Sequence, residues 1–171
     1  NPENPASSQA GSAPFQYDRW RVTFLATVLR VVAGLGLLLI LSNFPLMGNF
    51  ERVIFSVVYL AFLAATFLPM PYTVKAGTLI FSGYLMGVYT ILQAGPWSGA
   101  VSYFLATTVF AVLLFDRQVD RWVFLINLAT ISLAGILNIL GYAPLASAEA
   151  PATGLMDWIP YAADYLVLAI A

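Results

Sequence analysis

Residues 22–46 read VTFLATVLRVVAGLGLLLILSNFPL, a 25-residue apolar stretch in which Arg30 is the single charge. With a rise of about 1.5 Å per residue, a helix of this length exceeds the roughly 30 Å hydrocarbon core of a bilayer. Residues 1–17 carry no basic residue, and no small-residue cleavage site follows the stretch, so a cleavable signal is not indicated. We therefore expect a disordered polar tail over 1–17, followed by a retained helix that either crosses the membrane with a tilt or begins along the headgroups, as Arg30 favours.

The composition extends this prediction to the whole chain. Of its 171 residues 61% are apolar and 9% are charged, against roughly 45–50% and about 25% in soluble domains. The mean hydropathy of +0.85 excludes a soluble monomer and indicates an all-α, polytopic membrane bundle of about six transmembrane helices over residues 18–171. The last apolar run is too short to cross a bilayer, so we expect the polypeptide to continue beyond Ala171. The predicted spans are 22–46, 53–67, 74–92, 99–115, 123–140 and 158–171.

Charge and residue usage exclude several classes of function. A formal charge of −1 leaves no basic surface for nucleic acid, and the chain has neither cysteine nor histidine. Disulfides, imidazole ligation of metals and histidine-based catalysis are thereby excluded. The turn predicted at residues 116–121 repeats an Asp-Arg pair but offers too few oxygen donors for a metal ion. We expect no metal and no cofactor.

Basic residues and tryptophans predict how the chain lies in the bilayer. Six of the seven basic residues fall on one side of the predicted spans, and only Arg52 falls on the other. Because basic residues concentrate on the cytoplasmic side, the N-terminus is expected to be cytoplasmic. Each tryptophan lies at the edge of a predicted span, where the indole ring would anchor in the headgroups. The predicted anchors are Trp20, Trp97, Trp122 and Trp158.

Asp164 is the ionisable residue that most needs an explanation. It lies inside the last apolar run, where an Asp near a helix centre costs about 2.5–3.5 kcal/mol. Arg52 begins the second run near the same predicted membrane boundary, so an intramembrane ion pair between the two would offset this cost. A snorkelled carboxylate, a switch element and a ligand contact are the alternatives that remain open.

Small residues at helical spacing predict where helices contact one another, because helices in lipid associate by close packing. Gly83 and Gly87 form a GxxxG motif in the third run. The same spacing joins Ala61 to Ala65 and Ser102 to Ala106. Packing within the bundle and dimerisation both fit this pattern. Other polar side chains would either line a small apolar cavity or form hydrogen bonds between helices: Tyr59, Tyr84, Tyr89, Tyr103, Asn127 and Asn138.

From Leu68 to Tyr142 the chain resembles the membrane-spanning input region of bacterial sensor histidine kinases, a module also found ahead of other cytoplasmic signalling domains. The resemblance rests on a Leu-Pro pair before a basic residue, a Gly-Pro-Trp-Ser-Gly outer turn, a closing apolar run and a final span that opens with Trp158. The matching residues are Leu68-Pro69, Lys75, Tyr84, Gly87, Gly95–Gly99, Tyr103–Leu105 and Val112–Phe115.

The resemblance implies a non-catalytic, dimeric input module of the bacterial inner membrane, whose last helix drives a cytoplasmic coiled coil and kinase core. Two features depart from it: the turn at Asp116–Arg121 is longer and less basic, and the kinase portion with its phosphoacceptor histidine is absent. The lipid bilayer and a second copy of the chain are the expected partners. An accessory subunit of a larger membrane complex is the alternative function, and a small transporter or channel is a third.

Overall fold

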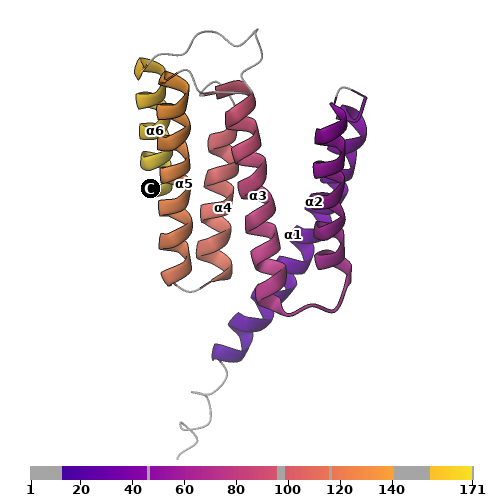
Figure 1. Cartoon of the computed structure of the whole chain (residues 1–171). Helices are drawn as coiled ribbons and strands as arrows, with labels where there is room; N and C mark the ends of the chain where they lie inside the picture. The colour runs from indigo at the N-terminus through magenta and orange to yellow at the C-terminus, as the bar shows by residue number, and fades with distance from the viewer. Residues whose placement is uncertain (1–12, 46, 96–98, 116, 141–154, 171) are drawn as a thin grey trace, which may run out of the picture. The chain divides into compact units, whose positions relative to one another are not determined.

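The computed structural model describes residues 13–45, 47–95, 99–115, 117–140 and 155–170 (Figure 1). Helices make up nearly all of this part of the chain, so the predicted all-α class is confirmed. Four of these helices are long and apolar enough to cross a membrane, over Arg19–Asn43, Asn49–Phe67, Tyr72–Gln93 and Gln118–Ile139. The described helices are α1 (Ala13–Asn43), α2 (Asn49–Phe67), α3 (Tyr72–Ala94), α4 (Ala100–Leu114), α5 (Arg117–Ile139) and α6 (Leu155–Ile170).

Proline and glycine mark the ends of several helices. Pro69 and Pro71 follow α2, and α3 begins directly after Pro71, because proline cannot continue a helix but is tolerated where the next one starts. Gly95 follows α3 with a φ of +61°, a left-handed conformation that glycine adopts without steric cost. At the start of α2, the carboxylate of Glu51 accepts a hydrogen bond from the backbone N–H of Gly48 at 3.0 Å.

Helices α1 and α5 begin six or more residues before the spans that the sequence analysis predicts. Helix α1 starts at Ala13, inside the predicted tail, and the rest of that tail lies outside the described residues. Helix α5 starts at Arg117, so Asp120 and Arg121 are helical and do not belong to a turn. An acidic residue in the first turn stabilises a helix through its dipole, and the Asp120 carboxylate accepts the N–H of Arg121 at 2.6 Å.

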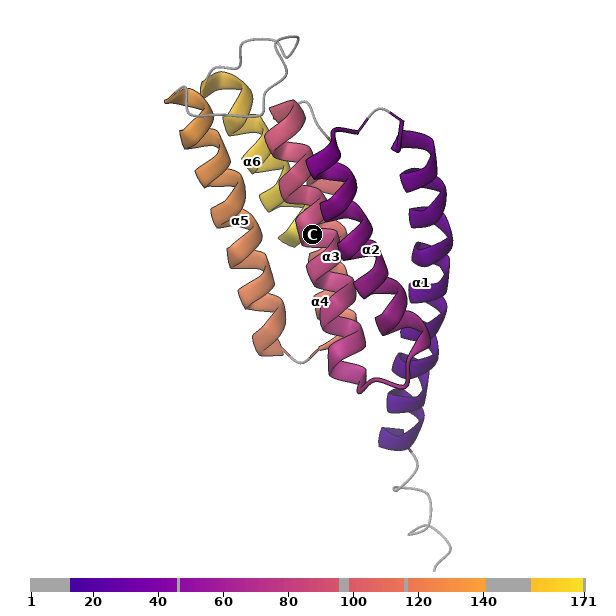
Figure 2. The same ribbon diagram turned by 45° about the vertical axis from the view of Figure 1, so that its right-hand side comes forward.

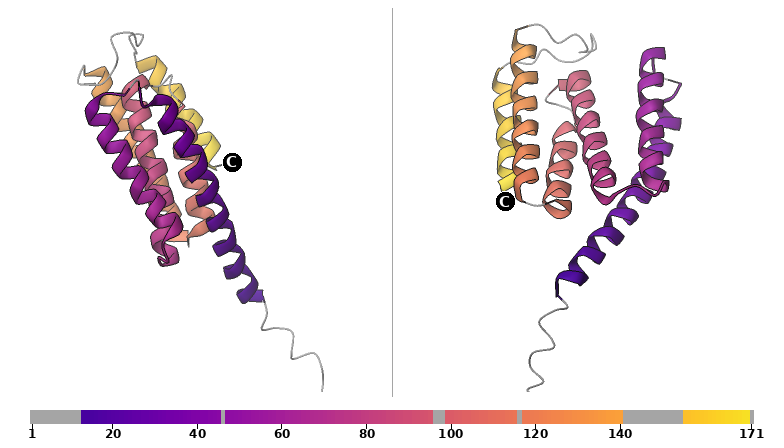
Figure 3. Two further views of the ribbon diagram at one scale, coloured as in Figure 1. Left: turned by 90° about the vertical axis from the view of Figure 1, so that its right-hand side faces the viewer. Right: turned by 60° about the horizontal axis from the view of Figure 1, so that its bottom comes forward.

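The chain divides into two compact units. The N-terminal unit ends at Ala76 and the C-terminal unit runs over Gly77–Ala171, so that α3 contributes its first residues to one and the rest to the other. In the N-terminal unit α1 packs beside α2 (Figure 2). In the C-terminal unit α4, α5 and α6 pack against one another in pairs (Figure 3). Each unit is described separately below.

Candidate functional site

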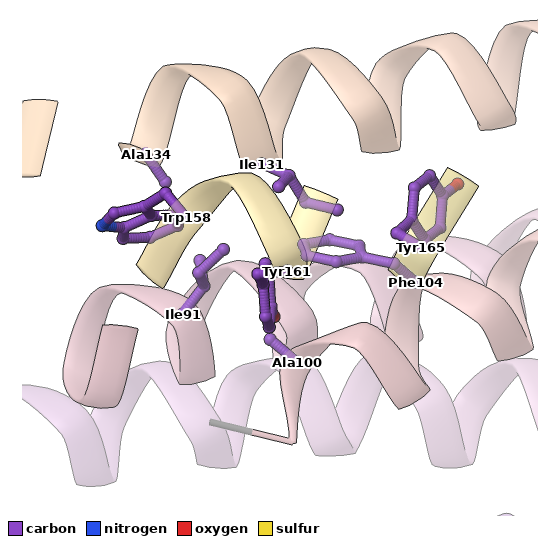
Figure 4. Packing of buried hydrophobic residues seen from close by; sticks show 8 residues of the cluster. All are labelled: Ile91, Ala100, Phe104, Ile131, Ala134, Trp158, Tyr161 and Tyr165. Atoms are coloured by element: carbon purple, nitrogen blue, oxygen red, sulfur yellow. The ribbon is translucent and has the colours of Figure 1, made fainter. Parts of the chain in front are cut away.

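The core of the C-terminal unit is an aromatic cluster to which α6 contributes three buried side chains. Trp158, Tyr161 and Tyr165 recur at helical spacing and place their rings among residues of α3, α4 and α5 (Figure 4). The Tyr165 ring stacks on Phe124 at 5.7 Å between centroids and meets Phe104 edge-on at 6.5 Å. One face of α6 is therefore held by packing along several turns. The cluster consists of Ile91, Ala100, Phe104, Ile131, Ala134, Trp158, Tyr161 and Tyr165.

A buried polar network joins α4, α5 and α6 next to this cluster. Thr107, Thr108 and Asn127 are all buried. The Asn127 amide nitrogen Nδ2 donates toward three acceptors on α4: the Phe104 carbonyl oxygen at 3.0 Å, Thr107 Oγ1 at 3.0 Å and Thr108 Oγ1 at 3.1 Å. An amide nitrogen has two hydrogens, so these three acceptors share them.

The hydroxyl of Tyr165 connects α6 to this network. Its oxygen lies 3.0 Å from Thr108 Oγ1. The single hydroxyl hydrogen of Thr108 is directed to the Phe104 carbonyl at 2.9 Å, so Tyr165 is the donor and Thr108 the acceptor. The Asn127 carbonyl oxygen Oδ1 is buried and has no hydrogen-bond partner among the described residues. The network is therefore incompletely satisfied, which is costly in an apolar interior.

Helix α3 packs on α4 through the predicted GxxxG motif. A Cβ atom added at Gly83 would lie 2.8 Å from Thr107 Cγ2, and one added at Gly87 would lie 2.8 Å from Phe104 Cε1. Both distances are shorter than side chains tolerate, so the two glycines provide the room for these contacts. Tyr84 lies between them and its hydroxyl is 2.8 Å from Thr130 Oγ1 on α5.

The other two pairs of small residues differ from the GxxxG motif in their exposure. Ser102 and Ala106 of α4 are exposed, as is Ala61 of α2, whereas Ala65 is buried. Packing against other described helices therefore does not account for the α4 pair or for Ala61, and dimerisation stays the alternative prediction for them. In α4 the buried positions are Phe104, Thr107, Thr108 and Ala111, because the network and the aromatic cluster occupy that side of the helix.

The predicted tryptophan anchors also differ from one another in how exposed they are. Trp20 and Trp122 are exposed, and Trp97 lies outside the described residues. Trp158 does not fit the prediction, since only 5% of it is exposed. Its ring packs where a Cβ added at Gly135 would lie 3.2 Å from Trp158 Cδ2. It is a core residue because Gly135 leaves space for the ring.

In the N-terminal unit the side chain of Arg52 forms hydrogen bonds with the segment that connects α1 to α2. Its Nε donates to the Phe44 carbonyl at 3.0 Å and its Nη2 to the Pro45 carbonyl at 3.4 Å, while the guanidinium lies 5.2 Å from the centre of the Phe44 ring. These carbonyls follow the end of α1, where no further helical N–H groups can reach them. Arg52 thus caps α1, much as Lys75 Nζ donates to the Thr66 carbonyl at 3.5 Å near the end of α2.

Tyr59 forms a polar contact between α1 and α2. Its hydroxyl donates to the Ala33 carbonyl at 2.7 Å. A Cβ added at Gly36 would lie 3.2 Å from Tyr59 Cε2, so the glycine lets the ring lie close to α1. Of the polar residues considered above, Tyr59, Tyr84 and Asn127 therefore form hydrogen bonds between helices.

The predicted ion pair joins Arg52 and Asp164, which belong to different units. Arg52 donates to two carbonyls, and its guanidinium group has five N–H donors in all. In a double-mutant cycle, effects of Arg52→Gln and Asp164→Asn on the free energy of unfolding that add to within about 0.5 kcal/mol would exclude the pair. Measurement is by equilibrium unfolding of the purified chain in mixed micelles with increasing dodecyl sulfate. A coupling above about 1 kcal/mol would establish the pair.

Sequence reasoning missed Thr107, Thr108 and Tyr165, which complete the polar network around Asn127. Two adjacent threonines inside a largely apolar helix were the available signal. The described residues contain no group of three carboxylate, histidine or cysteine side chains that would hold a metal ion. The site consists of hydroxyls, one amide and aromatic rings, and its chemistry is that of helix association.

Residues 19–170 match the model of one protein family, MASE11. No curated protein matches the chain. The solved structures likewise contain no match.

Proposed function

Because the chain belongs to the MASE11 family of membrane-associated sensor-type domains, we propose that it is the input domain of a bacterial signalling protein and that α6 carries its signal. In this proposal the domain is non-catalytic and lies in the inner membrane with its N-terminus in the cytoplasm. A stimulus changes helix packing, α6 shifts, and a cytoplasmic output domain beyond Ala171 responds. A histidine kinase is the output that the sequence resemblance favours.

The hydrogen bond from Tyr165 to Thr108 is the observation that supports this proposal most directly. It ties α6 to a buried network that leaves the Asn127 carbonyl oxygen without a partner in the described part of the chain. An acceptor without a donor is costly in an apolar interior, so an arrangement that satisfied it would be favoured, and a packed interface moves between discrete arrangements and does not deform continuously. A stimulus that favours another arrangement would therefore move α6.

The short connections between the described helices support a stimulus within or near the membrane. Helices α1 and α2, α2 and α3, α3 and α4, and α4 and α5 are each separated by only a few residues. Such segments are too short to fold an extracellular ligand-binding domain. A lipid state, a small apolar molecule and a partner protein are the stimuli that remain.

The variant Tyr165→Phe tests the proposal, because it removes the hydroxyl and keeps the ring. In the full-length protein we expect its basal output to differ from the wild type by about three- to twentyfold, the effect of losing an interhelical hydrogen bond of about 0.6–1.7 kcal/mol. The measurement is ATP-dependent autophosphorylation in membrane vesicles. Tyr103→Phe on α4, where the ring is only partly buried, is the matched control and should leave the output unchanged.

Two results would contradict the proposal. In the first, Tyr165→Phe lowers stability while the output keeps its wild-type level, which would make the network purely structural. In the second, the coding sequence downstream of Ala171 encodes only a short polar tail, which would favour an accessory subunit. A heptad-patterned helix that leads to a kinase would support the proposal. A cyclase in the same place would retain the signalling role and replace the kinase.

A further inference from the structure

The exposed side of α6 carries a carboxyl group among apolar side chains. Asp164 is exposed, and so are its neighbours Ile159, Leu166, Val167 and Leu168. Asp164 is the tenth residue of α6, about 13 Å from the first by the helix rise. If α6 crosses the bilayer, as proposed above, this carboxyl group lies deep in the hydrocarbon, where an unpartnered charge is costly.

The helices that pack against α6 offer no charged partner for Asp164. Helix α4 contains no charged residue between Ala100 and Leu114. The charged residues of α5 are Arg117, Asp120 and Arg121, all within its first five positions. The tyrosine hydroxyl nearest along α6, that of Tyr165, lies on the buried side and donates to Thr108. Within the described part of the C-terminal unit, Asp164 has no hydrogen bond or ion pair.

Asp164 belongs to an exposed stripe along one side of α6. Pro160, Asp164 and Val167 are all exposed and recur at spacings of four and three residues, as a and d positions of a coiled coil do. The stripe differs from the buried stripe of Trp158, Tyr161 and Tyr165 on the same helix. Helix α6 therefore has one face for its own unit and a second face without a partner in the described residues.

We propose that the stripe of Pro160, Asp164 and Val167 pairs with the same stripe of a second copy of this chain, with the two Asp164 carboxyl groups hydrogen-bonded to each other. A two-fold axis places identical residues opposite each other, and a carboxylic acid group is both donor and acceptor. A second copy thus supplies the missing partner without any further charged residue. The inference rests on the proposed membrane location of α6, and it does not depend on the output domain.

Disulfide cross-linking of the chain in phosphatidylcholine vesicles tests the interface. The chain has no cysteine, so each variant carries one thiol, and copper phenanthroline serves as the oxidant. A disulfide requires Cβ atoms about 3.5–4.5 Å apart. We expect Val167→Cys to form covalent dimers. Two controls should not: Leu166→Cys, exposed on the same helix but off the stripe, and Val112→Cys, exposed on α4.

The role of the carboxyl group is tested in the Val167→Cys background. Adding Asp164→Leu should weaken association by about five- to thirtyfold, as expected for the loss of an interhelical hydrogen bond worth about 1–2 kcal/mol. Adding Asp164→Asn should preserve association, because the amide is both donor and acceptor. Asp164 is exposed, so neither change disturbs the core. The readout is the fraction of cross-linked dimer as vesicles are diluted with lipid.

The alternative outcomes are distinguishable. If Leu166→Cys and Val112→Cys cross-link as well as Val167→Cys, or if Asp164→Leu has no effect, the interface is overturned. If Val167→Cys stays monomeric and also resists a membrane-impermeant maleimide, the interface between copies is overturned. In that case α6 lies in the bilayer as proposed, and its exposed face is covered by lipid or by the same chain. If that maleimide labels Val167→Cys readily, α6 lies in water and the proposed membrane location fails as well.

Discussion

Replacing Gly87 with alanine is expected to destabilise the C-terminal unit by about 1–3 kcal/mol, the range found for overpacked cores. The added Cβ would lie 2.8 Å from Cε1 of Phe104 and 3.1 Å from two further atoms of its ring. Phe104 is fully buried and is held between other rings, so it has little room to move. Equilibrium unfolding in dodecyl sulfate mixed micelles, followed by tryptophan fluorescence, measures the loss.

Gly77→Ala is the matched control for this prediction. Gly77 lies in the same helix, and a Cβ added there would meet nothing within 4 Å. Because alanine favours a helix over glycine by about 0.5–1 kcal/mol, Gly77→Ala should be neutral or stabilising. Equal destabilisation by both changes would show that Gly87 does not act through the contact with Phe104.

A compensating substitution gives a second check on this contact. Phe104→Leu removes ring atoms from the space that the new methyl group needs. In the presence of Phe104→Leu, Gly87→Ala should cost at least about 1 kcal/mol less than it does alone. Additive effects of the two changes would argue against direct contact.

Replacing Phe104 with alanine should cost about 3–5 kcal/mol, as removal of large buried side chains does. Phe104 is fully buried in the aromatic cluster, with its ring 6.1 Å from that of Tyr84 and 6.5 Å from that of Tyr165. The alanine variant would leave a cavity where α3, α4 and α6 meet. The same unfolding experiment measures this effect.

Phe81→Ala is the control for this second prediction. Phe81 lies on α3 and is 59% exposed, so its removal should change the free energy of unfolding by no more than about 0.5 kcal/mol. If Phe81→Ala and Phe104→Ala had similar effects, the aromatic cluster would not be the stabilising core of the unit.

The sequence predicted that some helix faces pack closely, although it did not identify the residues that they contact. The GxxxG motif predicts close packing of α3, and the structure places Gly83 and Gly87 against Thr107 and Phe104. Ser102 and Ala106 have the same spacing but are exposed. Small residues show where a close approach is possible, but the bulkier residues around them decide whether it happens within the chain.

Other features of the candidate site required the three-dimensional packing. Thr107, Thr108, Asn127 and Tyr165 come from three helices and meet only because α4, α5 and α6 pack against one another. Trp158 lies at the edge of an apolar run, as an anchor would, yet Gly135 accommodates it in the core. Arg52 donates to carbonyls that follow α1, a role that depends on how the chain turns between α1 and α2.

The amino-acid sequence alone determined that this protein is a set of apolar helices suited to a bilayer, because the length and hydropathy of each run set that outcome. The tertiary structure decided which side of each helix is buried in the protein. Where a helix is apolar nearly all round, hydrophobic periodicity does not distinguish the face that meets lipid from the face that meets another helix. Steric fit and hydrogen bonds between helices make that choice, and they exist only after the helices have packed.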